Sequence, residues 1–131
     1  MAPATAVSAA EPRQRPNALA GGVRRGYATV GSNTGHEGNS SYALDHPEQI
    51  KDFGYRSAHE MTVAAKTLIR AFYGRAPKLS LMAEAGGGTI AALSAAQRYP
   101  ADYDGLAVGH VLVSHQAHLR ADVGVAGDAR E

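Results

Sequence analysis

This sequence contains no cysteine and no tryptophan, and only 2 of its 131 residues are phenylalanine. Without cysteine, no disulfide can stabilise the fold and no thiol can act as a nucleophile. Large aliphatic residues are also scarce, because the 9 Leu, 9 Val and 3 Ile, even together with Phe, make up less than a fifth of the chain. Much of the 44% apolar content is therefore alanine. We expect a small core padded with alanine.

The sequence also has no marked excess of positive or negative charge and no long apolar run. The 13 basic and 12 acidic residues are spread along the chain, and no basic stripe suits a phosphate backbone, so nucleic acid is not an expected partner. No apolar run is long enough to span a membrane. The first residues are mostly alanine and are soon followed by Glu11, Pro12 and Arg13, which is unlike a signal peptide. Export is therefore not predicted, and the compartment remains unknown.

The two ends of the chain lack any periodic pattern. Residues 1–17 are rich in Ala, Pro and Arg and are expected to form a disordered leader. Residues 114–131 alternate Ala, Val, Gly and Asp with neither helical nor strand period, and are expected to form a disordered tail. One folded unit is expected over residues 18–113.

Between these ends, helices and strands alternate. Apolar residues recur at threes and fours from about Pro47 to Tyr73 and predict a long helix, divided near Gly54 and ended by a left-handed cap at Gly74. A second helix is predicted from Thr89 to Arg98. Strands are predicted at 26–30, 79–83 and 106–113, the last two apolar on both faces as in the middle of a covered sheet. The fold class is α/β, with two or three parallel strands and two main helices.

Eight segments of the chain carry a resemblance to a known family. They are RRGYAT (24–29), NTGH (33–36), YALDHPE (42–48), DFGYR (52–56), HEMT (59–62), FYGRAPK (72–78), AQRYP (96–100) and DYDG (102–105). In this order they resemble tannases and feruloyl esterases, which are α/β-hydrolases, over about residues 19–109. The resemblance implies part of a hydrolase sheet, and an ancestral activity of hydrolysing carboxylic esters such as galloyl or feruloyl esters. It implies no cofactor and no metal, and relatives are often exported.

The resemblance breaks where an α/β-hydrolase presents its nucleophile, on a sharp turn between a strand and a helix. Between Lys78 and Gln97 the family reads YSYFNGCSTGGRQALMEA, and this chain has a stretch of the same length. Gly86 therefore falls on the nucleophilic serine. Glycine has no oxygen that could attack a carbonyl. Only the Gly87 N–H, in the position of an oxyanion donor, could retain its role.

Other catalytic residues of the family also have no counterpart in this sequence. Ala85 falls on the cysteine before the serine, Gly88 on the first glycine of the turn, and Ile90 on an arginine. The family's catalytic Asp and His lie beyond a lid domain that the chain does not reach, and its upstream glycine loop has no counterpart in residues 1–17. These losses predict a truncated, inactive relative, although whether the chain is an enzyme stays open.

Other residues could carry chemistry, but their settings favour structural roles. Ser40 lies in a loop and lacks the second glycine of G-x-S-x-G. His59 and Glu60 begin an H-E-x-x-H zinc motif, but Val63 occupies the second ligand position. Three further histidines, at 110, 115 and 118, lie where the pattern dissolves.

Two functions from other classes remain as alternatives. One is a module that binds itself or a partner through sheet edges or the helical stripe. The other is a weak anion- or nucleotide-binding unit at the Gly86–Gly88 turn, since residues 86–91 fit G-x-G-x-x-A before a helix. Glu84 at the mouth of that turn would repel an anion.

Overall fold

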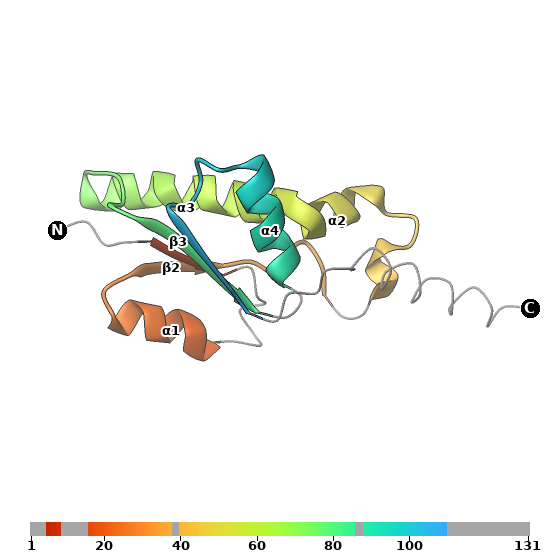
Figure 1. Ribbon diagram of the computed structural model, residues 1–131, viewed down its shortest axis with the longest axis horizontal. Helices are drawn as coiled ribbons and strands as arrows, with labels where there is room; N and C mark the ends of the chain where they lie inside the picture. The colour runs from red at the N-terminus through yellow and green to blue at the C-terminus, as the bar shows by residue number, and fades with distance from the viewer. Residues whose placement is uncertain (1–4, 9–15, 38–39, 86–87, 110–131) are drawn as a thin grey trace, which may run out of the picture.

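A sheet of four parallel strands forms the centre of the computed structural model, which describes residues 5–8, 16–37, 40–85 and 88–109 (Figure 1). The strands are β1 (Thr5–Ser8), β2 (Ala28–Gly31), β3 (Ser80–Ala85) and β4 (Gly105–Gly109). They lie in the order β2-β1-β3-β4, with Val7 level with Val30 and Met82, and Met82 level with Leu106. The predicted α/β class is confirmed in this broad sense.

Helices lie on both faces of the sheet. The connection from β1 to β2 crosses the sheet in one direction, whereas the connections from β2 to β3 and from β3 to β4 cross it in the other. Because such crossovers are right-handed, α1 (Pro16–Arg24) lies on one face, and α3 (Ser57–Tyr73) and α4 (Thr89–Arg98) lie on the opposite face (Figure 1).

The long predicted helix is a continuous run of three elements. The run begins with α2 (Pro47–Lys51), passes through one π-helical turn, η2 (Asp52–Arg56), and continues as α3. Gly74 ends it with φ 70°, in the left-handed region that favours glycine. The predicted cap is therefore confirmed, as are both ends of α4. A short 3-10 helix, η1 (Ser40–Ala43), precedes α2.

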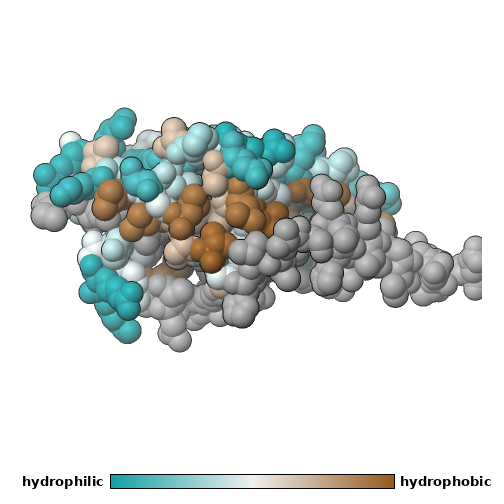
Figure 2. Space-filling model, viewed as in Figure 1, coloured by the Kyte–Doolittle hydropathy of each residue, from teal (hydrophilic) through white to brown (hydrophobic). Residues whose placement is uncertain are grey.

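The core is small and built largely of alanine, as the composition predicts. Alanine on α3 and α4 lets both helices approach the sheet closely. Met82 on β3 is the largest of the fully buried side chains in the described residues. The cluster comprises Ala58, Met82, Ala91, Ala92 and Ala95, with Tyr103 and Val108 packed against it. In Figure 2, apolar side chains form a band at the level of the sheet, below the hydrophilic outer surface of the helices.

The structure corrects the prediction of a disordered leader at residues 5–8 and 16–17, and the rest of that segment, 1–4 and 9–15, lies outside the described residues. Thr5–Ser8 form β1, which pairs with both β2 and β3, and α1 begins at Pro16. A four-residue strand flanked by alanine and proline carries too short a pattern to be recognised alone, and its two neighbouring strands supply its hydrogen bonds. The predicted count of two or three strands and two helices was therefore too low.

Of the two strands predicted to lie in the middle of a covered sheet, β3 lies between β1 and β4, and it is β4 that differs from the prediction. Among the described strands, β4 lies at an edge, and Leu106 on it is 37% exposed. The predicted tail at 114–131 lies outside the described residues.

The apolar stripe on α3 is only partly buried, since Ala58, Ala65 and Ile69 face the sheet while Leu68 and Phe72 are 70% and 82% exposed. No helix in the described part of the chain is long and apolar enough to cross a membrane.

Candidate functional site

The strand–turn–helix arrangement expected around the nucleophile position is present. β3 ends at Ala85 and α4 begins at Thr89, so the turn between them lies at the carboxyl end of β3. Ligands of parallel sheets bind at this edge. Gly86 and Gly87, the predicted nucleophile and oxyanion positions, lie outside the described residues.

A buried carboxylate lies beside this turn. Glu84, the last but one residue of β3, is only 4% exposed. Its Oε2 atom lies so close to Gly88 that a Cβ atom at position 88 would overlap with it. The start of a helix favours negative charge. The Glu84 carboxylate therefore occupies the position at the start of α4 where an external anion would bind.

Tyr103 packs against the core cluster and contacts α3. Its hydroxyl shares a hydrogen bond with Thr62 Oγ1, which also lies 2.7 Å from the Ala58 carbonyl oxygen, to which it donates. Burial raises the pKa of Tyr103 to about 12, and the negative charges of Asp102 and Glu84 act in the same direction. Tyr103 is therefore a neutral phenol at ordinary pH and cannot serve as a general base there.

His59 forms a close pair with Asp102. Nδ1 of His59 lies 2.6 Å from Oδ2 of Asp102, and the imidazole stacks on Tyr99 with ring centroids 3.8 Å apart. Lys66 Nζ donates to the Asp102 carbonyl oxygen at 2.5 Å. These contacts give His59 a structural role, joining α3 to the connection between α4 and β4.

This His–Asp pair resembles half of a catalytic triad, but its place in the fold is wrong for one. The Asp104 N–H donates to the carbonyl oxygen of Ser80 at 2.7 Å, at the beginning of β3. Asp102 therefore lies by the amino end of β3, whereas the turn follows its carboxyl end. A six-residue strand separates these ends by about 17–20 Å. Asp102 does not orient a base for residue 86.

An open polar pocket of about 450 Å³ lies between the loop after β2, η1 and the start of α2. His36 in its wall stacks on Tyr42 at 4.1 Å between ring centroids and meets Phe53 edge-on at 5.2 Å. The Thr34 hydroxyl forms a hydrogen bond with His36 Nδ1 at 3.1 Å. Burial raises the pKa of Tyr42 above its usual value. The family-like segment NTGH therefore contributes His36 to a ring cluster with Tyr42 and Phe53, a contact that its sequence pattern alone does not reveal.

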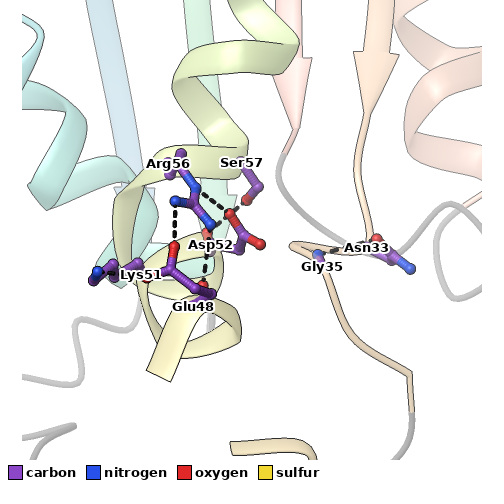
Figure 3. Close-up of polar contacts among 7 residues, drawn as sticks. All are labelled: Asn33, Gly35, Glu48, Lys51, Asp52, Arg56 and Ser57. Carbon is purple, nitrogen blue, oxygen red and sulfur yellow. Dashed lines mark hydrogen bonds and ion pairs between the residues drawn. The ribbon is translucent and has the colours of Figure 1, made fainter. Parts of the chain in front are cut away.

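The close approach of η2 requires a glycine at position 35. Gly35 has φ 82°, and a Cβ atom there would lie 2.9 Å from the Cβ of Asp52. Its N–H donates to Asn33 Oδ1 at 3.1 Å (Figure 3). Any larger residue would strain the backbone and push η2 away.

Charged residues of the family-like segments fasten α2 and η2 together (Figure 3). Arg56 contacts Asp52 Oδ1 through Nε at 2.6 Å and Glu48 Oε2 through Nη1 at 2.7 Å. Lys51 Nζ lies 2.6 Å from Glu48 Oε1. Hydrogen bonds from Lys51 and Arg56 lower the pKa of Glu48, and Asp52 raises that of Arg56. The Ser57 N–H closes the π-helical turn by donating to the Asp52 carbonyl oxygen, to which Ser57 Oγ also donates at 2.8 Å.

The remaining candidates from the sequence are not brought together. Ser40 begins η1 rather than a strand-to-helix turn, and Glu60 and Val63 are exposed on α3. The histidines at 110, 115 and 118 lie outside the described residues. Within the described ranges, no group of three His, Asp or Glu residues could hold a metal ion.

A parallel α/β sheet with a strand–turn–helix at its carboxyl edge defines a class of folds that includes hydrolases. Comparison with known sequences identifies the family: residues 4–129 match the family described as tannase and feruloyl esterase, and the chain belongs to it.

Curated relatives agree with this assignment. The chain is 38% identical over 110 residues to a probable feruloyl esterase B of Aspergillus niger. The aligned segment covers 79% of this chain and 21% of the relative. It is 41% identical over 85 residues to a probable feruloyl esterase B-2 of Neosartorya fischeri, covering 64% and 16%. An uncharacterized esterase of Xanthomonas campestris is 40% identical over 87 residues, covering 64% and 15%. The chain thus spans about a fifth or less of the length of these relatives.

Proposed function

We propose that this chain carries the nucleophile-turn region of a tannase and feruloyl esterase sheet in a form that does not hydrolyse esters. One observation carries the proposal. Between Lys78 and Gln97 the chain and the family string have equal lengths, and Gly86 falls on the serine. Acyl transfer needs a nucleophile that glycine cannot supply.

Glu84 supports the loss of activity independently of Gly86. The same alignment places Glu84 on a glycine of the family string, and the structure buries its carboxylate beside the start of α4. Ester hydrolysis develops negative charge on the substrate oxygen, which is normally stabilised by N–H groups at this turn. A carboxylate fixed against Gly88, at the start of α4, would destabilise that oxyanion by charge repulsion.

By descent, the substrate class would be carboxylic esters of aromatic acids, since the relatives are named as feruloyl esterases. The stacked ring of Tyr42 and the polar pocket beside it would suit a phenolic group. In this chain we expect such a ligand to bind without being cleaved.

Hydrolysis assays test the proposal directly. The purified chain would be assayed with methyl ferulate, methyl gallate and a p-nitrophenyl ester, alongside the heat-denatured chain and the Aspergillus niger feruloyl esterase B. We expect the active control to turn over substrate and this chain to match its denatured blank. Saturable turnover that co-purifies with the chain and persists in a Ser40→Ala variant would refute the proposal.

The exposed apolar residues favour one alternative, a module that associates with itself or a partner. Leu68 and Phe72 are largely exposed on α3, and both outer strands of the described sheet have open edges. The other alternative, anion binding at the Gly86–Gly88 turn, is disfavoured because the Glu84 carboxylate already lies against Gly88.

A further inference from the structure

The backbone of the loop after β2 is strained at Thr34. Its φ of 58° lies in the left-handed region, which β-branched residues avoid because Cβ crowds the backbone there. The one other non-glycine residue with positive φ in the described ranges is Asp45, whose short polar side chain suits this conformation better. Such strain persists only where surrounding contacts impose it, and it is concentrated at functional sites. The contacts of Thr34 therefore indicate what its conformation achieves.

These contacts lie within the loop and on the adjoining helix. The Thr34 N–H donates to Ser32 Oγ at 3.0 Å, and the Thr34 hydroxyl donates to the carbonyl oxygen of Asn33 at 2.6 Å. Next in the chain, Gly35 donates to Asn33 Oδ1 and lies against Asp52 of η2 (Figure 3). Thr34 itself is only 6% exposed. Because all these partners are close along the chain or on η2, the geometry of the loop does not depend on what packs around it from outside.

The hydroxyl of Thr34 also determines which ring nitrogen of His36 carries a proton. His36 Nδ1 lies 3.1 Å from Thr34 Oγ1. A hydroxyl has a single proton to donate, and that of Thr34 is directed to the Asn33 carbonyl oxygen. The contact with His36 therefore requires Nδ1 to be the donor. In a neutral imidazole the other nitrogen, Nε2, then carries the lone pair.

We propose that Thr34 is a positioning residue, held in a strained conformation because its hydroxyl fixes His36 in the Nδ1–H tautomer with Nε2 as a hydrogen-bond acceptor. The orientation of the ring is fixed as well, since it stacks on Tyr42 and meets Phe53 edge-on. The loop follows the carboxyl end of β2, at the edge of a parallel sheet where ligands bind. Nε2 of His36 would accept a hydrogen bond from a hydroxyl or ammonium group there. The inference goes beyond the proposed function and does not depend on it.

A role for Thr34 in shaping the backbone alone would favour a different residue. Glycine adopts the left-handed conformation without strain, and it would keep the N–H that donates to Ser32. What glycine would lack is the oxygen that accepts the proton of His36 Nδ1. The strain at position 34 is therefore explained by the hydroxyl and not by the turn.

The tautomer of His36 can be measured directly by NMR on the full, 15N-labelled chain. Correlations between ring protons and ring nitrogens would be recorded at about pH 9, where an imidazole is neutral, and a His36→Asn variant would assign the signal. We expect a protonated Nδ1 and an unprotonated Nε2 in the parent chain and in Thr34→Ser, which keeps the hydroxyl. Thr34→Val and Thr34→Gly should instead show the averaged nitrogen shifts of an unrestrained imidazole. A proton on Nε2 in the parent chain, or an unchanged Nδ1–H signal in Thr34→Val, would overturn the inference.

Urea denaturation tests the strain separately from the tautomer. Thr34→Gly and Thr34→Val both lack the hydroxyl, but only glycine relieves the backbone. We expect the higher urea midpoint for Thr34→Gly, which reverses the usual order at a buried position, where the smaller side chain is the less stable one. Asp45→Gly is the matched control, because it also places glycine at a positive φ, of 59°, and should leave the His36 signal unchanged.

The outcomes are distinct. A Thr34→Val variant as stable as Thr34→Gly would show that the backbone is not strained, and a His36 signal altered by Asp45→Gly would show that the tautomer does not depend on Thr34 in particular. Either result would overturn the inference. If Thr34→Val fails to fold, the parent chain and Thr34→Ser still decide the tautomer.

Discussion

The Glu84 carboxylate fills the space that a side chain on Gly88 would need, across the turn that joins β3 to α4. In the family string the corresponding pair is two glycines. An acidic residue at position 84 is therefore accommodated because position 88 has remained glycine, and this coupling can be measured.

We expect Gly88→Ala to lower the free energy of unfolding by about 1–3 kcal/mol, because the new methyl group would overlap with a buried carboxylate. In the Glu84→Ala background the same substitution should cost much less. A double-mutant cycle by urea denaturation measures this difference. Gly54→Ala is the control, since no atom lies within 4 Å of the added Cβ. Equal costs of Gly88→Ala in both backgrounds would show that the two residues do not interact.

We expect that Gly86→Ser alone will not create an esterase. A serine hydroxyl without a positioned base is a weak nucleophile, and the His59–Asp102 pair is held near the other end of β3. Labelling with a fluorophosphonate, followed by peptide mass spectrometry, is the measurement. A stoichiometric adduct on residue 86, absent from the parent chain, would mean that a base is in place.

Tyr103 should make stability depend on pH in the alkaline range. Its pKa is about 12 in the folded chain and 10.0 in the reference state, so folding favours the neutral phenol. Its contribution is therefore complete below pH 10 and is lost as the pH rises toward 12. Denaturation midpoints between pH 8 and 11 should fall more steeply for the parent chain than for Tyr103→Phe.

At neutral pH, Tyr103→Phe should cost about 1 kcal/mol, since the bond to Thr62 is lost while the ring stays packed. The exposed Tyr73→Phe provides the comparison. If the two variants show the same pH dependence, then Tyr103 is not the group responsible.

Thermal stability should be marginal, with a midpoint below about 60 °C. The core holds few large side chains, and ordering each residue costs about 1.5 kcal/mol. The helix α3 should be the most persistent element, which hydrogen exchange of residues 57–73 would show. A sharp transition well above about 60 °C would contradict the expected marginal stability.

Local signals in the sequence were sufficient for α4, for the run from Pro47 to Tyr73 and for the cap at Gly74. In each case the apolar period, a glycine or a proline acts within a few residues of the feature that it determines. The same holds for the nucleophile position, where an equal number of residues between two matched segments placed Gly86 without any structure.

Tertiary structure alone decided the features that depend on distant partners. β1 forms because β2 and β3 supply hydrogen bonds to its backbone on both sides. The two glycines of α1 weaken a helix taken by itself, and only in the folded structure does Gly22 pack closely against Thr29. His59 and Asp102 are 43 residues apart in the chain, so no local pattern relates them. The burial of Glu84 likewise follows from the placement of α4 over β3, because a single carboxylate in a short strand gives no sign of which face will be covered.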